Sequence, residues 1–192
     1  MIKHRRFGGC VVTAFVAGWL FLFGLGENSH LLAQDQTLDE LMEQLSDPEL
    51  EDWEPVERQI WELWSLSGSD ALDLLLRRGR DAMELGDFNE AIAHFTAVID
   101  HSPEFAEGWN ARATAFYFAG QFGQSMADIE RVLALNPDHF GALTGMAMIL
   151  EETGKSAEAL VVVRRVLEVH PHRPDVLMAR DRLEAETEGS AL

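Results

Sequence analysis

One spacing constrains this chain more than any other feature of its sequence. Two sets of residues recur at intervals of 34 residues, the prolines Pro103, Pro137 and Pro171 and the glycines Gly86, Gly120 and Gly154. A fixed period of this length is typical of stacked helix–turn–helix units, because such a unit cannot bury its apolar face without a neighbour. The spacing therefore predicts an all-α scaffold that presents a surface, not a reaction centre.

The period divides this region into three pairs of helices. We expect helices at about 70–84, 88–101, 104–118, 122–135, 139–152 and 156–169. The glycines follow the first helix of each pair, where a positive φ is often required, and the prolines follow the second helix, which they cannot continue. Asp87 and Glu90 form a capping pair at the start of one second helix.

Residues at fixed places within each period resemble the tetratricopeptide repeat family. The middle repeat carries the resemblance through Trp109, Arg112, Ala113, Phe116, Ser125, Ile129 and Pro137. The first repeat carries it through Leu75, Gly79, Ala91, Phe95 and Pro103, and the third through Leu143, Ala147, Leu150, Ala159, Val163 and Pro171. The departures are Arg78 and Arg112 in place of Leu, Ala82 in place of Tyr, and Ser156 in place of an aromatic residue. The resemblance covers about residues 72–173 and implies a right-handed α-α superhelix with repeats at about 72–105, 106–139 and 140–173.

Two helical segments are expected to flank the repeats. Residues 34–66 should contain two helices, the second beginning near Glu54 and Pro55, and this pair is either a degenerate repeat or an N-terminal cap. At the other end, residues 174–188 are predicted to form a capping helix with a charged outer face, followed by a tail at 189–192.

The first 33 residues have the pattern of a secretory signal peptide. Lys3, Arg5 and Arg6 precede a long uncharged run, and Ala33 offers a small residue for cleavage. The chain is therefore expected to be exported to a bacterial periplasm, where "bacterial" rests on resemblance to short, acidic, exported repeat proteins. The alternative is an uncleaved anchor facing the periplasm, because residues 8–26 approach the roughly 20 residues that span a bilayer.

Composition and motifs argue against several functions. The chain has 33 acidic and 15 basic residues, a formal net charge of −18, which disfavours nucleic acid and anionic membrane surfaces as partners. Its single cysteine, Cys10, lies in the expected leader. No set of residues forms a convincing active site, so we expect no enzyme activity, no cofactor and no bound metal. His170 and His172 are the most metal-like pair, but Pro171 fixes the backbone between them, and a role at a helix end is favoured over a small metal-dependent activity.

Binding of a protein partner is the preferred function. The family resemblance implies that the first helix of each repeat lines a concave groove that takes peptides. Carried over slot by slot, it predicts a site formed by Arg80, Asn110, Thr114, Tyr117, Phe118 and Met148. We expect the partner to be a peptide segment of an exported or membrane protein. A different hypothesis is structural self-assembly through the tryptophan-rich N-terminal helices, and the oligomeric state stays open.

The same slots indicate which ligands the groove should not favour. In the family's chaperone-binding version, Lys, Arg and Asn side chains clamp a pair of carboxylates. Here Leu76, Ala111, Gly141 and Gly145 occupy most of those slots and leave Arg80 as the lone cation, so a chaperone C-terminus is not expected. Asn110 is predicted to hold a ligand backbone through its donor and its acceptor, and Glu107 and Glu151 are predicted to repel acidic ligands.

Overall fold

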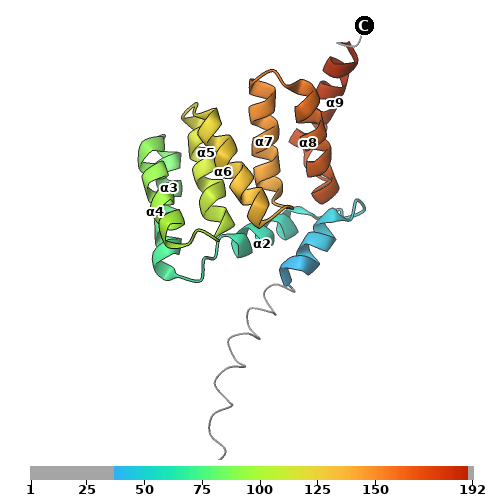
Figure 1. Cartoon of the computed structure of the whole chain (residues 1–192). Helices are drawn as coiled ribbons and strands as arrows, with labels where there is room; N and C mark the ends of the chain where they lie inside the picture. Colours follow the sequence, from blue (N-terminus) through green and yellow to red (C-terminus); the bar gives the residue numbers. More distant parts are fainter. Residues whose placement is uncertain (1–36, 190–192) are drawn as a thin grey trace, which may run out of the picture. The chain divides into compact units, whose positions relative to one another are not determined.

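A computed structural model describes residues 37–189, and all regular secondary structure in that range is helical. The expected leader or anchor at residues 1–33 lies outside the described residues. A short helix at residues 37–46 is followed by α2 (Glu54–Trp64), α3 (Asp70–Glu84), α4 (Phe88–His101), α5 (Ala106–Phe118), α6 (Phe122–Leu135), α7 (Phe140–Glu152), α8 (Ser156–Val169) and α9 (Pro174–Gly189). Figure 1 shows α3 to α8 as three successive antiparallel pairs, with α9 after the last pair. The all-α solenoid predicted by the period is confirmed.

The bounds of the helices follow the predicted ones closely, with two differences among the repeat helices and one in α9, which ends at Gly189 where residue 188 was predicted. Helices α5 and α7 begin at Ala106 and Phe140, whereas the sequence predicted residues 104 and 139. The chain after each proline first makes a turn, in which the backbone N–H of Phe105 donates to Ser102 (3.1 Å) and that of His139 donates to Asn136 (3.2 Å). Each helix therefore starts one or two residues later than predicted.

The glycine positions have the backbone conformation that the period predicted. Gly86, Gly120 and Gly154 have φ values of 75°, 72° and 73°, which residues with a Cβ atom rarely adopt. After Gly86, the N–H of Asp87 donates to the carbonyl of Ala82 (2.9 Å), and the Asp87 side chain accepts from the N–H of Glu90 (3.1 Å). One short turn thus ends α3 and caps α4.

Small residues allow the two helices of a repeat to approach closely. The Ser125 hydroxyl on α6 is buried and donates to the carbonyl of Ala113 on α5 (2.7 Å). At Gly79 on α3, an added Cβ would lie 2.3 Å from the ring of Phe95 on α4. Glycine at this position is therefore required by contact with an aromatic ring.

Arg112, a departure from the family pattern, makes a buried ion pair between α5 and α6. Its guanidinium donates to both carboxylate oxygens of Asp128, at 2.7 and 2.9 Å, and a third donor reaches Thr96 (3.1 Å). The same group lies 5.1 Å from the ring centroid of Trp109. The bidentate geometry explains how a charged residue replaces leucine at this position.

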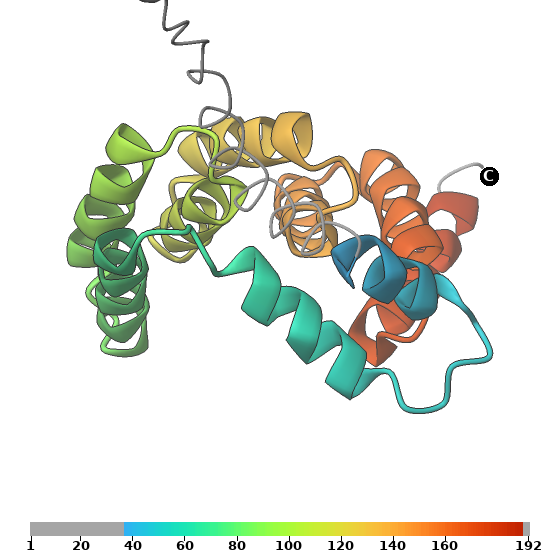
Figure 2. The same ribbon diagram turned by 90° about the horizontal axis from the view of Figure 1, so that it is seen from below.

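The N-terminal helices do not stack ahead of the first repeat. Leu45, Val56 and Ile60 are buried in one apolar cluster with residues of α7, α8 and α9, such as Phe140 and Val166. Figure 2 shows α2 running obliquely along one side of the row of repeat helices, from the α3 end to the α8 end. The segment is therefore neither a degenerate repeat in front of α3 nor a cap on the first repeat, but a strap along the stack.

The last helix, α9, covers the C-terminal end of the row of repeats. Val176 and Leu183 of α9 are buried in the same cluster as Val163 and Val166 of α8. In contrast, Met178 of α9 is exposed. Among the described residues, no helix is long and apolar enough to span a bilayer.

Candidate functional site

The six predicted groove residues all lie on first helices, but they belong to two separate hollows and one exposed edge. We name the hollows by their place along the chain. The N-terminal hollow, of about 990 Å³, is lined by Arg80, Asn110 and Thr114 among other residues. The C-terminal hollow, of about 310 Å³, is lined by Tyr117 and Met148 among others. Five of the six predicted residues are thus distributed over two hollows on the same face.

The sixth residue, Phe118, lines neither hollow. Its ring is 57% exposed and stacks on Phe88 at 5.9 Å between centroids, while Tyr117 meets it edge-on at 5.5 Å. These contacts place Phe118 at the edge where α5 ends, beside the start of α4. It can contact a ligand that passes over this edge, but it does not line a hollow.

The N-terminal hollow lies between α2, α3 and α5. Its apolar surface comes from Leu76, Met83 and Phe95 of the first repeat, together with Trp61 and Leu66 of the α2 region. Charged side chains of both signs complete its lining, namely Arg58, Glu62, Asp73, Arg77, Arg80, Glu84 and Glu107. One wall of this hollow is thus built by a segment outside the repeats.

A buried carboxylate organises the lining of the N-terminal hollow. Glu107 is only 4% exposed, and it accepts from Arg80 (2.7 Å) and from the side-chain amide of Asn110 (3.0 Å). Arg80 also donates to the hydroxyl of Ser65, just after α2 (3.0 Å). This network joins α3 and α5 to the end of α2.

The network engages two residues for which ligand contacts were predicted. Asn110 is 8% exposed, and one of the two N–H donors of its amide is used by Glu107, which leaves its second donor and its carbonyl acceptor. The charge of Glu107 is compensated by Arg80 at 2.7 Å, so Glu107 does not present a free negative charge to an acidic ligand. Both residues take part in the network that joins α3 and α5, and the ligand contact predicted for Asn110 stays a prediction.

His139 connects the same network to the aromatic residues of α2. Its Nδ1 accepts from the N–H of Ala142 (3.1 Å), so the proton of the neutral ring is on Nε2, which lies 3.4 Å from a Glu107 oxygen. Trp64 stacks on the His139 ring at 4.2 Å between centroids. Trp61 covers Gly141, where an added Cβ would lie 2.5 Å from the indole. The predicted groove slot at Gly141 is therefore filled by the chain's own tryptophan.

The sequence carries a signal for this contact between Trp61 and Gly141. Asp73, Glu107 and Gly141 occupy equivalent slots, and only the third repeat has no side chain there. A missing side chain on a groove wall, together with unassigned tryptophans upstream, is compatible with an intramolecular contact. Spacing alone could not pair Trp61 with Gly141, because the contact joins segments far apart in sequence.

The C-terminal hollow is formed by α5, α7, α8 and α9. Its polar lining includes Glu151 and Glu152 at the end of α7 and Asp175 and Arg182 of α9. Arg182 pairs with Glu151, and Arg173 pairs with Asp175 (2.6 Å). Partial burial raises the pKa of the Tyr117 hydroxyl, and the charges of Glu152 and Glu151 raise it further.

The two histidines considered as metal ligands have structural contacts. His170 follows α8, and its fully buried ring lies between Trp53 and Phe140, with Nε2 3.7 Å from Glu57. His172 donates to the carbonyl of Asp47 (2.9 Å). Within residues 37–189, no group of three histidine, cysteine or acidic side chains is placed to hold a metal ion.

Comparisons with known proteins agree with this architecture. Two family models described as tetratricopeptide repeat match residues 76–120 and 119–183. A TPR repeat-containing protein of Rhizobium etli is 38% identical over 121 residues, which are 62% of this chain and 58% of that protein. The chain thus spans little more than half the length of this relative.

Solved structures show the same fold at low sequence identity. The first TPR of Spaghetti (RPAP3), bound to an HSP90 peptide, has a TM-score of 0.59 at 22% identity and covers 61% of this chain and 93% of its own. The type III secretion translocator chaperone SycD of Yersinia enterocolitica has a TM-score of 0.59 at 16% identity, covering 62% and 96%. Sequence models, relative and fold agree, and the chain belongs to the tetratricopeptide repeat family.

Proposed function

We propose that this chain is a non-catalytic interaction scaffold that binds an extended peptide segment of an exported or membrane protein along its first-helix face. One observation carries the proposal: both hollows lie on that face, and each combines an apolar floor with charged side chains. Such a surface suits a peptide that buries alternate side chains and keeps its polar groups at the rim. The HSP90 peptide bound by a structural neighbour supports the choice of ligand class.

The compartment assigned to the partner rests on the N-terminal sequence. Residues 1–33 combine basic residues, an uncharged run and a small residue at the expected cleavage point. An exported scaffold would meet exported or membrane proteins. Mass spectrometry of the protein from its native host tests this part separately, because a mature N-terminus near residue 34 is expected, and an intact Met1 would favour the anchored alternative.

Site-specific photo-crosslinking tests the binding face. A photoreactive amino acid replaces Leu66 in the N-terminal hollow or Met148 in the C-terminal hollow, which are 55% and 42% exposed. Val161 on the second helix α8, 67% exposed, is the matched control. We expect adducts of the same mass from both groove positions in the cell envelope and none from Val161. Adducts from Val161 alone would reject the groove as the binding face.

Self-assembly through the tryptophan-rich N-terminal helices is less well supported. Trp53, Trp61 and Trp64 contact His170, His139 and Phe140 of the same chain. Rings that pack within one chain offer less surface to a second copy. No contact among the described residues favours this alternative over groove binding.

A further inference from the structure

The C-terminal hollow combines an apolar floor with a concentration of negative charge. Tyr117, Met148 and Ala179 form this apolar floor, and the Met148 side chain is 42% exposed. Glu151 and Glu152 also line this hollow, and Glu152 is exposed. Such a surface can hold the aliphatic stem of a long side chain while its polar end reaches the carboxylates.

The ends of two helices add to the negative charge at this place. Helix α5 ends at Phe118 and α7 ends at Glu152, and neither has a basic residue in its last turn. The C-terminal end of a helix carries a partial negative charge, which cations stabilise and anions oppose. Placing Glu151 and Glu152 in the last turn of α7 is therefore locally unfavourable, and a cation supplied from outside would relieve it.

The ion pairs of the hollow leave one carboxylate available. Arg182 pairs with Glu151, and Arg173 pairs with Asp175. Across residues 37–189, Glu152 forms no ion pair, and it is exposed. Burial raises the pKa of the Tyr117 hydroxyl, and the nearby charges of Glu152 and Glu151 raise it further.

We infer that the C-terminal hollow accepts a lysine or arginine side chain of the bound segment and thereby selects basic partners. The stem would lie on Met148 and against the Tyr117 ring, and the cationic end would meet Glu152 and the end of α7. The volume of about 310 Å³ is sufficient for one long side chain. This inference rests on the proposed function, which it deepens by naming the chemistry of the ligand.

The N-terminal hollow has a different balance of charge, so the preference for a basic side chain should be confined to the C-terminal hollow. Its lining includes Arg58, Arg77 and Arg80 beside its acidic residues. These three arginines nearly balance the four acidic residues there, Glu62, Asp73, Glu84 and Glu107, whereas the C-terminal hollow has three acidic residues and a single arginine, Arg182, which is paired with Glu151. The two hollows should therefore set the direction in which a peptide with charge at one end lies along the groove.

Binding of three matched peptides to the purified full-length chain tests the inference. The labelled peptides share one length and one apolar pattern and carry Lys, Gln or Glu at the same positions, and fluorescence anisotropy measures their dissociation constants. We expect the Lys peptide to bind tightest and the Glu peptide weakest, with the preference decreasing as salt is added. Equal affinity for the Lys and Gln peptides would overturn the inference.

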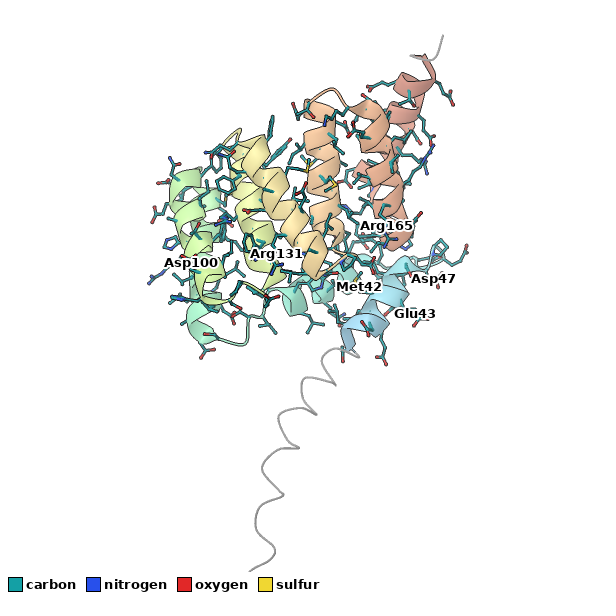
Figure 3. The ribbon with its side chains drawn as sticks, viewed as in Figure 1. Met42, Glu43, Asp47, Asp100, Arg131 and Arg165 are labelled. Carbon is teal, nitrogen blue, oxygen red and sulfur yellow. The ribbon has the colours of Figure 1, made fainter. Side chains whose placement is uncertain are left out.

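Two charge-neutralising variants locate the effect. Glu151→Gln with Glu152→Gln should weaken binding of the Lys peptide about tenfold and leave the Gln peptide unchanged. Glu152→Gln alone keeps the Arg182–Glu151 pair and should account for most of this loss, because Glu152 is the carboxylate of the hollow without an ion pair among the described residues. The control variant, Asp100→Asn with Glu130→Gln, removes the same charge from exposed sites on the second helices α4 and α6. Figure 3 labels Asp100 on α4.

The outcomes separate this inference from the proposed function. A Lys preference lost in the hollow variant and kept in the control variant supports the inference. A Lys preference unchanged in both variants overturns it, because the cation then binds elsewhere, yet it leaves groove binding intact. Crosslinking at Leu66 and Met148 judges groove binding separately. Circular dichroism melting curves that coincide for all variants show that lost binding is not lost folding.

Discussion

Arg112 illustrates how a residue that departs from a family pattern is held by a single partner. Its bidentate pair with Asp128 is largely buried, with the two side chains 16% and 7% exposed. A buried charge without its partner retains its desolvation penalty and loses the compensating attraction. The pair as a whole can be replaced by apolar residues at little cost, whereas either residue alone cannot.

We therefore predict that Arg112→Leu lowers the free energy of unfolding by about 3–5 kcal/mol. Combining it with Asp128→Ala should restore most of that loss, because no uncompensated carboxylate remains. Urea denaturation provides the measurement. Arg131→Leu is the control, since its pair with Glu104 is exposed and should contribute about 0–1 kcal/mol. A double variant as unstable as the single one would contradict this explanation.

Glu57 makes the attachment of α2 sensitive to acid. Interaction with His170 holds the pKa of Glu57 below its ordinary value of 4.5, against the opposing effect of partial burial, and Arg173 contributes in the same direction. A carboxylate with a lowered pKa in the folded state stabilises that state above its unfolded pKa. This contribution is lost as the pH falls from about 4.5 through the folded-state pKa.

Unfolding at a series of pH values tests this expectation. Glu57→Gln should be less stable than the wild type at neutral pH, and the difference should shrink as the pH falls below about 4.5. Glu62→Gln, an exposed change on the same helix, should leave the wild-type pH profile unaltered. A constant difference between Glu57→Gln and the wild type at all pH values would rule out titration of Glu57 as its cause.

At the scale of elements, α2 depends on close contact with glycine in the third repeat. An alanine at Gly141 would place its Cβ 2.5 Å from the Trp61 indole, so the indole must move. We predict that Gly141→Ala loosens α2, costs about 1–3 kcal/mol, and shifts tryptophan fluorescence to longer wavelength. Limited proteolysis should cut faster in the connection at residues 65–69.

Gly123→Ala is the matched control for this prediction. Gly123 is also helical, in α6, but no atom lies within 4 Å of an added Cβ. Alanine favours a helix over glycine, so this variant should be as stable as the wild type or slightly more stable. If limited proteolysis cut Gly141→Ala and Gly123→Ala at the same rate, the contact between Trp61 and Gly141 would not be what holds α2 in place.

The repeat helices and the strap differed in how far the sequence could predict them. The repeats obey local rules, so positive-φ glycines such as Gly86 and terminating prolines such as Pro103 fixed their bounds within two residues. The position of α2 depends on Trp61 finding Gly141, a contact between distant segments that periodicity does not encode. For the same reason the repeat positions predicted which helix face forms the groove, but not the hydrogen bond between Asn110 and Glu107 within it.

At the scale of the whole molecule, stability depends on covering the last repeat. Leu183 of α9 is 1% exposed within the cluster that includes Val163 and Val166 of α8. We predict that Leu183→Ala lowers the free energy of unfolding by about 2–5 kcal/mol and increases binding of an apolar dye. Met178→Ala on the same helix, where the side chain is 64% exposed, should change stability by less than about 0.5 kcal/mol. Equal effects of the two changes would show that α9 does not seal the stack.

The strap formed by residues 37–64 also constrains the order in which parts of the chain can fold. Most contacts of a solenoid join neighbouring repeats, so folding can spread from any point along it. Here His172 bonds to Asp47 across 125 positions, and Leu45 shares a cluster with Leu183. The strap helices precede the repeats in the chain and must therefore wait for the last helices before they can dock, and closing so long a loop slows that step. Once closed, the loop links the early and late parts of the chain, so the repeats should come apart together and not one at a time.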